Sequence, residues 1–153
     1  MKYTTEIIIK IPLTDFLKKL QNPKNLKHWQ RGFIRYDYIS GVPGDIGSKM
    51  KLVYKLGKRE TALEETVIYK QFPHKIQVMY DTDGMQRIQE NYFSETPELH
   101  TKWTSITECI PMNFRMRMFI LLMPGILSKQ TKQYMQDFKN FAENGTSINN
   151  EKT

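Results

Sequence analysis

The stretch that decides the fold is IPLTDFLKKLQNPKNLKHWQRG, residues 11–32, which predicts two short helices in succession. Pro12 suits the first turn of a helix because proline has its backbone angle φ already fixed near the helical value. The apolar residues of this first helix fall on one side, at Leu13, Phe16, Leu17 and Leu20. Two helices this short bury little surface by themselves, so their apolar residues must pack onto something larger.

The second half of the stretch predicts a structural corner. Pro23 starts the second short helix, and Trp29 supplies a large apolar plug where the helix pair meets the rest of the protein. Gly32 then lets the chain turn sharply into the next element, because glycine tolerates positive φ.

A sheet surrounds this helix pair in the sequence. Residues 3–11 alternate apolar and polar side chains with a period of two, which predicts a strand with one buried face. Six further segments with strand patterns are separated by hairpin-sized turns, at 33–40, 48–58, 61–72, 75–82, 85–93 and 99–110. Seven strands joined in this way predict a meandering antiparallel sheet in an α+β protein.

The pattern changes after Pro111 to apolar residues at helical spacing. We expect a long C-terminal helix that is kinked at Pro124-Gly125, where proline removes a backbone donor. Its first half is apolar nearly all round and should be covered on more than one side. The domain is expected to span 1–144, followed by a disordered tail at 145–153 because that segment is polar and low in complexity.

Composition excludes several classes of protein. The chain has 153 residues and one cysteine, Cys109, so it cannot form an internal disulfide or a thiolate metal cluster. The longest apolar run, 118–127, is too short to span a bilayer, and the N-terminus does not resemble a signal peptide, which makes a cytosolic location the expectation. The net charge of +7 comes from scattered basic residues, which favours a solvated surface over nucleic-acid binding and permits weak contact with anionic membranes.

The order strand, two short helices, six strands, long helix resembles the helix-grip fold of the START-like, or SRPBCC, superfamily. That superfamily includes polyketide cyclases, lipid-transfer proteins and pollen-allergen-like proteins. Three segments carry the resemblance: IPLTDFLKKLQNPKNLKHW at 11–29, GVPGDIGSKMKL at 41–52, and RMRMFILLMPGILSKQTKQYMQDFKNFAE at 115–143. The resemblance covers about residues 2–143 and implies a curved sheet around the C-terminal helix, commonly with a ligand cavity between them.

The strand alternation and the helical spacing predict which residues face such a cavity. From the sheet we expect Ile34, Tyr36, Met50, Leu52, Tyr54, Val67, Tyr69, Ile76, Val78, Tyr80, Ile88, Tyr92 and Trp103, and from the helix Met112, Met116, Phe119 and Met123. Methionine is flexible and can line an adjustable pocket, although it is also an ordinary filler of cores. The alternative is an interior packed solid with no cavity.

Two glutamates interrupt the apolar faces. Glu65 shares its predicted face with Val67 and Tyr69, and Glu90 lies between Ile88 and Tyr92. If they point inward, burial would raise their pKa values, and each could hold a polar ligand group or act as an acid or base. The alternative is a one-residue slip or a bulge that turns them outward.

Other chemistry is not indicated. His28, His74 and His100 are scattered without metal-ligand spacing, so we expect no metal site. Cys109 has no adjacent histidine, and no glycine-rich phosphate loop, catalytic triad or cofactor motif is present.

Three functions are compatible with these observations. The first is binding or transport of a hydrophobic small molecule, such as a lipid, polyketide or aromatic compound. The second is a cyclase- or dehydratase-like enzyme that uses Glu65 or Glu90 together with Tyr54 or Tyr80. The third is a module that works at a membrane or protein surface through residues 118–127. The sequence is compatible with a monomer or a homodimer.

Overall fold

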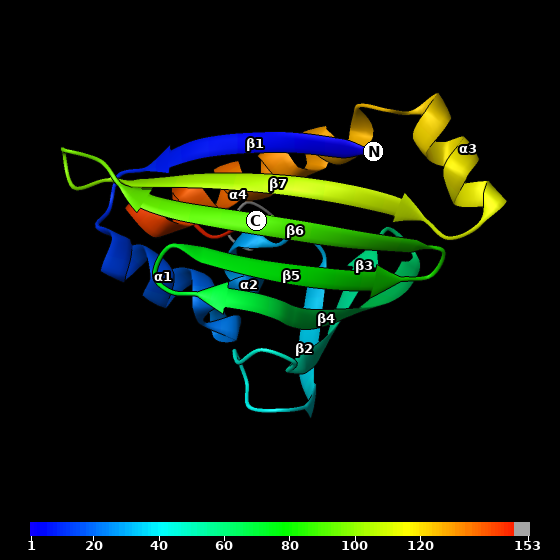
Figure 1. Cartoon of the computed structure of the whole chain (residues 1–153), viewed down its shortest axis with the longest axis horizontal. Coiled ribbons are helices and arrows are strands. Elements are labelled where there is room, and N and C mark those ends of the chain that lie inside the picture. Colours follow the sequence, from blue (N-terminus) through cyan, green and yellow to red (C-terminus); the bar gives the residue numbers. More distant parts are fainter. Residues whose placement is uncertain (149–153) are drawn as a thin grey trace.

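A computed structural model describes residues 1–148 and confirms the predicted α+β architecture. All seven strands form one antiparallel sheet in the order β1-β7-β6-β5-β4-β3-β2 (Figure 1). Their bounds are β1 Lys2–Ile9, β2 Phe33–Ser40, β3 Lys49–Leu56, β4 Arg59–Gln71, β5 Lys75–Thr82, β6 Met85–Glu95 and β7 Thr101–Pro111. Neighbours in the sheet are mostly neighbours in sequence; only the first strand crosses over, to pair with the last.

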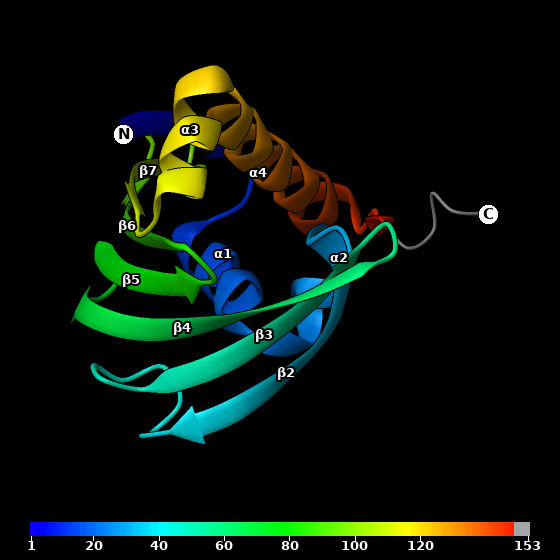
Figure 2. The same cartoon turned by 90° about the vertical axis from the view of Figure 1, so that its right-hand side faces the viewer.

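The sheet curves strongly, and the helices occupy its concave side (Figure 2). The first helix is α1, Leu13–Gln21, followed by a 3₁₀ turn η1, Pro23–Asn25, and the single-turn helix α2, Leu26–Trp29. The C-terminal helix α4, Ile126–Asn144, crosses the same side. This arrangement is the predicted helix-grip fold.

Pro124-Gly125 separates two helices and does not kink one. Helix α3, Phe114–Leu122, ends before this dipeptide, and α4 begins after it in a different direction (Figure 2). The expectation that the first half of the C-terminal helix is covered on more than one side is wrong. Within α3, Phe114, Leu121 and Leu122 leave 76%, 72% and 74% of their surface exposed.

Helix α4 is fixed to the rest of the protein by polar contacts along its length. The hydroxyls of Tyr3 and Thr131 are 2.9 Å apart, and Lys139 Nζ donates to the carbonyl of Ile8 at 2.7 Å. On the opposite side, Arg31 donates from Nε and Nη2 to the buried carboxylate of Asp137, at 2.9 and 3.1 Å. A bidentate pair of this kind fixes orientation as well as distance. The helix is therefore held between β1 and the corner that follows α2.

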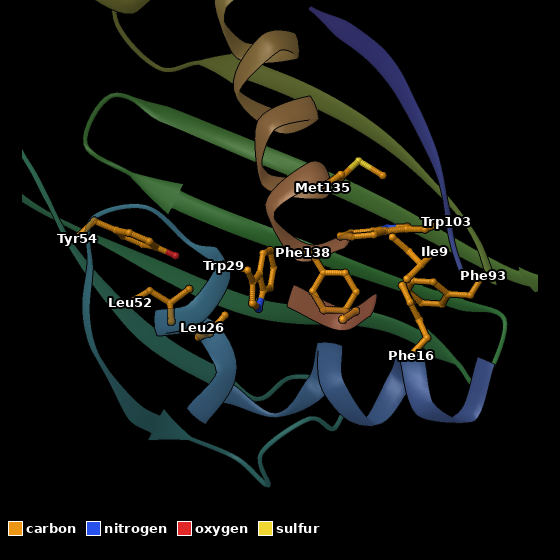
Figure 3. Packing of buried hydrophobic residues seen from close by; sticks show 11 residues of the cluster. Ile9, Phe16, Leu26, Trp29, Leu52, Tyr54, Phe93, Trp103, Met135 and Phe138 are labelled. Atoms are coloured by element: carbon orange, nitrogen blue, oxygen red, sulfur yellow. The ribbon is translucent and has the colours of Figure 1, made fainter. Parts of the chain in front are cut away.

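An aromatic cluster fills one end of the space between the sheet and the helices (Figure 3). Phe138 of α4 lies at its centre, with ring centroids 5.3 Å from Phe16, 5.2 Å from Trp29 and 5.6 Å from Trp103. All three contacts are edge-to-face, the geometry that aromatic quadrupoles favour. One side chain thus joins α1, α2, α4 and strand β7 of the sheet.

The predicted corner at residues 23–32 is confirmed. Trp29 is buried against Phe138, and Gly32 has φ of +79°. A Cβ atom on Gly32 would lie 2.5 Å from the carbonyl oxygen of Lys55, so the close approach of β2 to β3 requires glycine here.

The predicted tail is described for its first four residues, 145–148. Ser147 and Ile148 are buried, and the hydroxyl of Ser147 lies 2.9 Å from Nδ1 of His28. These residues are packed against the domain. The remainder of the predicted tail, 149–153, lies outside the described residues.

Among residues 1–148, no helix combines the length and the hydropathy needed to cross a bilayer.

Replacing Phe138 with alanine should lower the free energy of unfolding by about 3–5 kcal/mol, since the variant loses a fully buried ring and leaves a cavity among its three aromatic partners. Urea unfolding followed by far-UV circular dichroism measures this change. Leu121→Ala is the control: its side chain is largely exposed, so the change should stay within about 0.5 kcal/mol. Equal effects of the two substitutions would contradict the central role of Phe138.

Candidate ligand cavity

Two adjoining cavities remain in the part of the interior that the aromatic cluster does not fill. The first chamber, of about 340 Å³, extends from α1 and η1 across the concave face of β3–β6 to the loop at 42–48. Its lining includes Tyr38 and Pro43, which are exposed, so this chamber reaches the surface beside that loop. The second chamber, of about 220 Å³, lies between the same sheet and the first half of α4.

The two chambers adjoin and have part of their lining in common. The residues that line both are Trp29, Gln30, Tyr80, Gln89 and Trp103. The interior is therefore a divided cavity and not the solidly packed core of the alternative interpretation. Its size falls in the range that small-molecule sites have in proteins, about 300–1,000 Å³.

Several residues predicted to face the cavity do line it. In the first chamber these are Met50, Val67, Ile76, Val78, Tyr80 and Trp103, and in the second chamber they are Tyr54, Tyr80 and Trp103. Glu65, whose direction the sequence left open, also lines the first chamber. Strand alternation therefore predicts the inward-facing side chains of β3, the first half of β4, β5 and β7 correctly. Leu52 also points inward but belongs to the packed core, and Tyr36 packs against that core without lining either chamber.

The predicted inward face of β6 is wrong. Ile88, Glu90 and Tyr92 lie on the convex face of the sheet, and the lining of the chambers comes instead from Arg87, Gln89, Asn91 and Phe93. Hydropathy misleads on this strand because the cavity wall is polar there, while the outer face carries isoleucine and tyrosine. The turn between β5 and β6 shows which residues of β6 face the cavity. The two-residue Asp83-Gly84 turn pairs Thr82 with Met85, which places Arg87 opposite Tyr80 and therefore on the same face.

Tyr69 and Ile34 are also turned away from the cavity. A β-bulge after Val67 shifts the pairing of β4, so Tyr69 pairs with Gln77 on the outer face and is exposed. Ile34 lies beside a second irregularity, between Phe33 and Arg35, and is exposed as well. Bulges change the alternation without any change in hydropathy, so the sequence pattern does not show them.

The helical residues predicted for the cavity do not reach it. Met112 precedes α3, Met116 and Phe119 belong to α3, and Met123 follows it, and none of the four lines either chamber. The break at Pro124-Gly125 moves this segment away from the concave face. Leu127, Gln130, Thr131, Tyr134 and Met135 of α4 provide the helical wall of the second chamber instead.

Glu65 and Tyr80 form the polar centre of the first chamber. They are directly opposite each other on β4 and β5, and their side chains are hydrogen-bonded. Burial raises the pKa of Glu65, and the hydrogen bond with Tyr80 offsets this rise only in part. Burial likewise raises the pKa of Tyr80 well above its ordinary value. The pair offers a carboxyl group and a neutral phenol to whatever occupies the chamber.

Amide side chains complete the polar wall. Tyr54 donates from its hydroxyl to Oε1 of Gln30. Gln89 Nε2 donates to the hydroxyl of Ser105 at 2.9 Å, and Trp103 Nε1 donates to Oδ1 of Asn91 at 2.9 Å. These bonds hold the polar residues of the wall in fixed positions.

Glu90 takes no part in the cavity. Its carboxylate lies 3.5 Å from Lys75 Nζ and accepts a hydrogen bond from the hydroxyl of Tyr92 at 2.7 Å. The hydrogen bond from Tyr92, together with the charge of Lys75, lowers the pKa of Glu90 and outweighs the opposing effect of burial. The enzymatic interpretation therefore reduces to Glu65 with Tyr80 or Tyr54.

His28 and Cys109 are in structural positions. His28 stacks on Phe141, with ring centroids 5.1 Å apart, and Cys109 is buried, which raises the pKa of its thiol. Within the described range 1–148, no three histidine, cysteine or acidic side chains gather as a metal site would require.

No family model and no curated protein match the chain. Solved structures do match over nearly its whole length. The protein of unknown function SA2116 from Staphylococcus aureus has a TM-score of 0.76 at 11% identity, covering 95% of this chain and 94% of its own. A conserved protein from Geobacillus kaustophilus gives 0.74 at 13% identity, covering 93% and 95%. Ara h 8.0201 gives 0.72 at 6% identity, covering 93% and 97%.

These similarities confirm the fold that the sequence resemblance implied. The chain has the helix-grip fold, with a seven-stranded curved sheet around a C-terminal helix. At such low identity the likeness concerns the fold alone, because this fold carries many functions.

Glu65→Gln should change how stability depends on pH. Because the folded-state pKa of Glu65 is raised above 4.5, the wild-type protein loses stability as the pH rises from about that value to the raised pKa, and the loss is constant above it. The Glu65→Gln variant does not lose stability in this way. Its unfolding free energy minus that of the wild-type protein should therefore increase across that pH range. Urea titrations between about pH 4 and pH 8 measure it.

The matched control is Glu64→Gln. Glu64 is the adjacent residue, lies on the outer face and pairs with Lys49 at 3.1 Å. The unfolding free energy of Glu64→Gln minus that of the wild-type protein should not increase as the pH rises. The same pH profile for both variants would contradict the buried environment of Glu65.

Proposed function

We propose that the protein binds a hydrophobic small molecule in the divided cavity between the sheet and α4. The observation that carries this proposal is the first chamber, which is continuous with the surface beside the loop at 42–48 and is lined by apolar side chains around a few fixed polar groups. That combination is typical of small-molecule sites, where apolar surface gives affinity and a few polar groups fix orientation.

Three further considerations support the proposal. The fold is shared with Ara h 8.0201 and with bacterial proteins, and the START-like resemblance implies hydrophobic ligands. The aromatic cluster around Phe138 stabilises the domain without filling the chambers. Glu65 and Tyr80 form a polar pair within an apolar surrounding, where a hydrogen bond to a ligand is strong. A cytosolic location, and a monomer or homodimer as the working form, belong to this proposal as expectations from the sequence.

A cavity-filling substitution tests the proposal. N-phenyl-1-naphthylamine, a neutral apolar probe, should bind the wild-type protein with an increase in fluorescence, and 1-decanol should displace it. Val78→Phe places a larger side chain from β5 into the first chamber and should weaken binding of the probe by about tenfold or more, because the added ring occupies ligand space.

Met79→Phe is the control, since it enlarges the next residue of the same strand on the outer face and should leave the affinity unchanged. Thermal unfolding of both variants confirms that they fold. Failure of the wild-type protein to bind the probe or 1-decanol would reject the proposed function.

A second function, contact with an anionic membrane surface, is favoured by α3. The exposed apolar residues of this segment are Met112, Phe114, Met118, Phe119, Leu121, Leu122, Met123 and Ile126. Between Glu108 and Asp137 the sequence has no acidic residue, whereas it has four basic ones, Arg115, Arg117, Lys129 and Lys132. An apolar helix with this charge complements a bilayer that contains anionic lipid.

Substituting both Leu121 and Leu122 with aspartate should abolish this contact. The wild-type protein should co-sediment with vesicles of phosphatidylcholine containing about 30% phosphatidylglycerol, and added salt should weaken the association. The double variant should remain in the supernatant. The control is Val42→Asp with Ile46→Asp, which changes two comparably exposed apolar residues, 66% and 61%, in the loop between β2 and β3. Sedimentation that does not depend on anionic lipid, or equal loss in both double variants, would contradict the role of α3.

A further inference from the structure

Arg87 is the cationic side chain among the residues that line the second chamber. It lies near the start of β6, opposite Tyr80 on β5 and Cys109 on β7, and so on the concave face of the sheet. Its guanidinium carbon is 5.3 Å from the centre of the Tyr80 ring. The cation is therefore positioned by strands on both sides and faces the interior of the domain.

Nothing in the described part of the chain neutralises this charge. Nε of Arg87 is buried without a hydrogen-bond partner, and no carboxylate among residues 1–148 lies within 4 Å of its guanidinium. The inward-facing acids nearby have other partners: Glu65 is bonded to Tyr80, and Asp137 is bonded to Arg31 and Gln133. A partly buried cation without a counter-ion costs free energy, which a bound anion would recover.

The surroundings of Arg87 suit an anion and not a second cation. Tyr54, Tyr80 and Tyr134 line the second chamber close enough to Arg87 for its charge to lower their pKa values, but burial has the larger effect and keeps the pKa of each phenol raised. These tyrosines therefore stay neutral and supply hydroxyl groups without competing for the guanidinium as anions. A further donor, the indole nitrogen of Trp29, is buried without a partner in a side chain that lines both chambers.

We infer that the second chamber is a binding site for the carboxylate of an amphipathic ligand, with Arg87 as its counter-ion. This inference rests on the proposed function and specifies its ligand class: an apolar acid whose body occupies the first chamber. Guanidinium and carboxylate match as planar two-pronged partners, which gives both strength and orientation.

Tyr80 links the two chambers in this arrangement. Its ring borders Arg87, which lines the second chamber, and its hydroxyl is bonded to Glu65, which lines the first. A ligand that places its carboxylate at Arg87 therefore extends past Tyr80 toward the Glu65–Tyr80 pair, where a second polar group would find a partner. The order of contacts along the ligand is thus an acid at one end, an apolar middle and a hydrogen-bonding position beyond it.

A matched pair of probes tests the inference on the whole chain. Decanoate and 1-decanol have the same chain length and differ in the head group, and each can displace N-phenyl-1-naphthylamine from the wild-type protein. Decanoate should bind about 10- to 100-fold more tightly than 1-decanol near pH 8, because a hydrogen bond to a charged partner is stronger than one between neutral groups. Arg87→Gln should lose most of this preference while its affinity for 1-decanol stays within about threefold.

Arg59→Gln is the matched control, since it removes the same charge from an exposed position at the start of β4 and should keep the preference for decanoate. Equal affinities of the wild-type protein for the two probes would overturn the inference and leave the proposed function intact. An equal loss of affinity for decanoate and for 1-decanol in a folded Arg87→Gln variant would also overturn the inference. If the Arg87→Gln variant does not fold, the affinities of the wild-type protein for decanoate and 1-decanol test the inference by themselves. Binding of neither probe would reject the proposed function and the inference together.

Discussion

The structure depends on one packing constraint, the edge-to-face contacts that Phe138 makes with Phe16, Trp29 and Trp103. The curved sheet is open, since its edge strands β1 and β2 do not pair with each other, so something must fill its concave side. The aromatic cluster does this at one end and joins α1, α2 and α4 to the sheet through a few large rings (Figure 3). Because these rings supply stability locally, the rest of the concave side need not be filled by side chains, and two chambers remain there.

The polar character of the chamber walls explains why the cavity is more than a packing defect. An empty space left by imperfect packing is lined by apolar atoms, whereas these walls contain Glu65, Tyr80, Arg87 and Gln89 in fixed positions. Burying such groups costs free energy unless each finds a partner. Glu65 and Gln89 find partners within the protein, whereas Nε of Arg87 has no hydrogen-bond partner among residues 1–148. The unpaired cation is consistent with a ligand that completes the site.

The exposed helix and the cavity are neighbours in the fold. The backbone N–H of Met112 donates to the carbonyl of Gly84 in the β5–β6 turn, and the side chains of Asn113 and Met116 pack against that glycine. The next residue, Met85, lines the second chamber. Contact of α3 with a lipid surface would therefore bring this end of the cavity close to the source of an apolar ligand, which connects the two proposed activities physically.

The sequence by itself determined the seven strands, the helix pair with its corner at Trp29 and Gly32, and the apolar nature of residues 112–127, because periodicity, proline and glycine act locally. It also predicted Val78 and Tyr80 to face the cavity, where strand alternation is regular, and left the direction of Glu65 open. Only the tertiary structure decided that Arg87 faces inward and Glu90 outward, that a bulge turns Tyr69 away, and that the apolar side chains of α3 are exposed. Those outcomes depend on pairing register and on what lies across the cavity, and hydropathy along a single strand encodes neither.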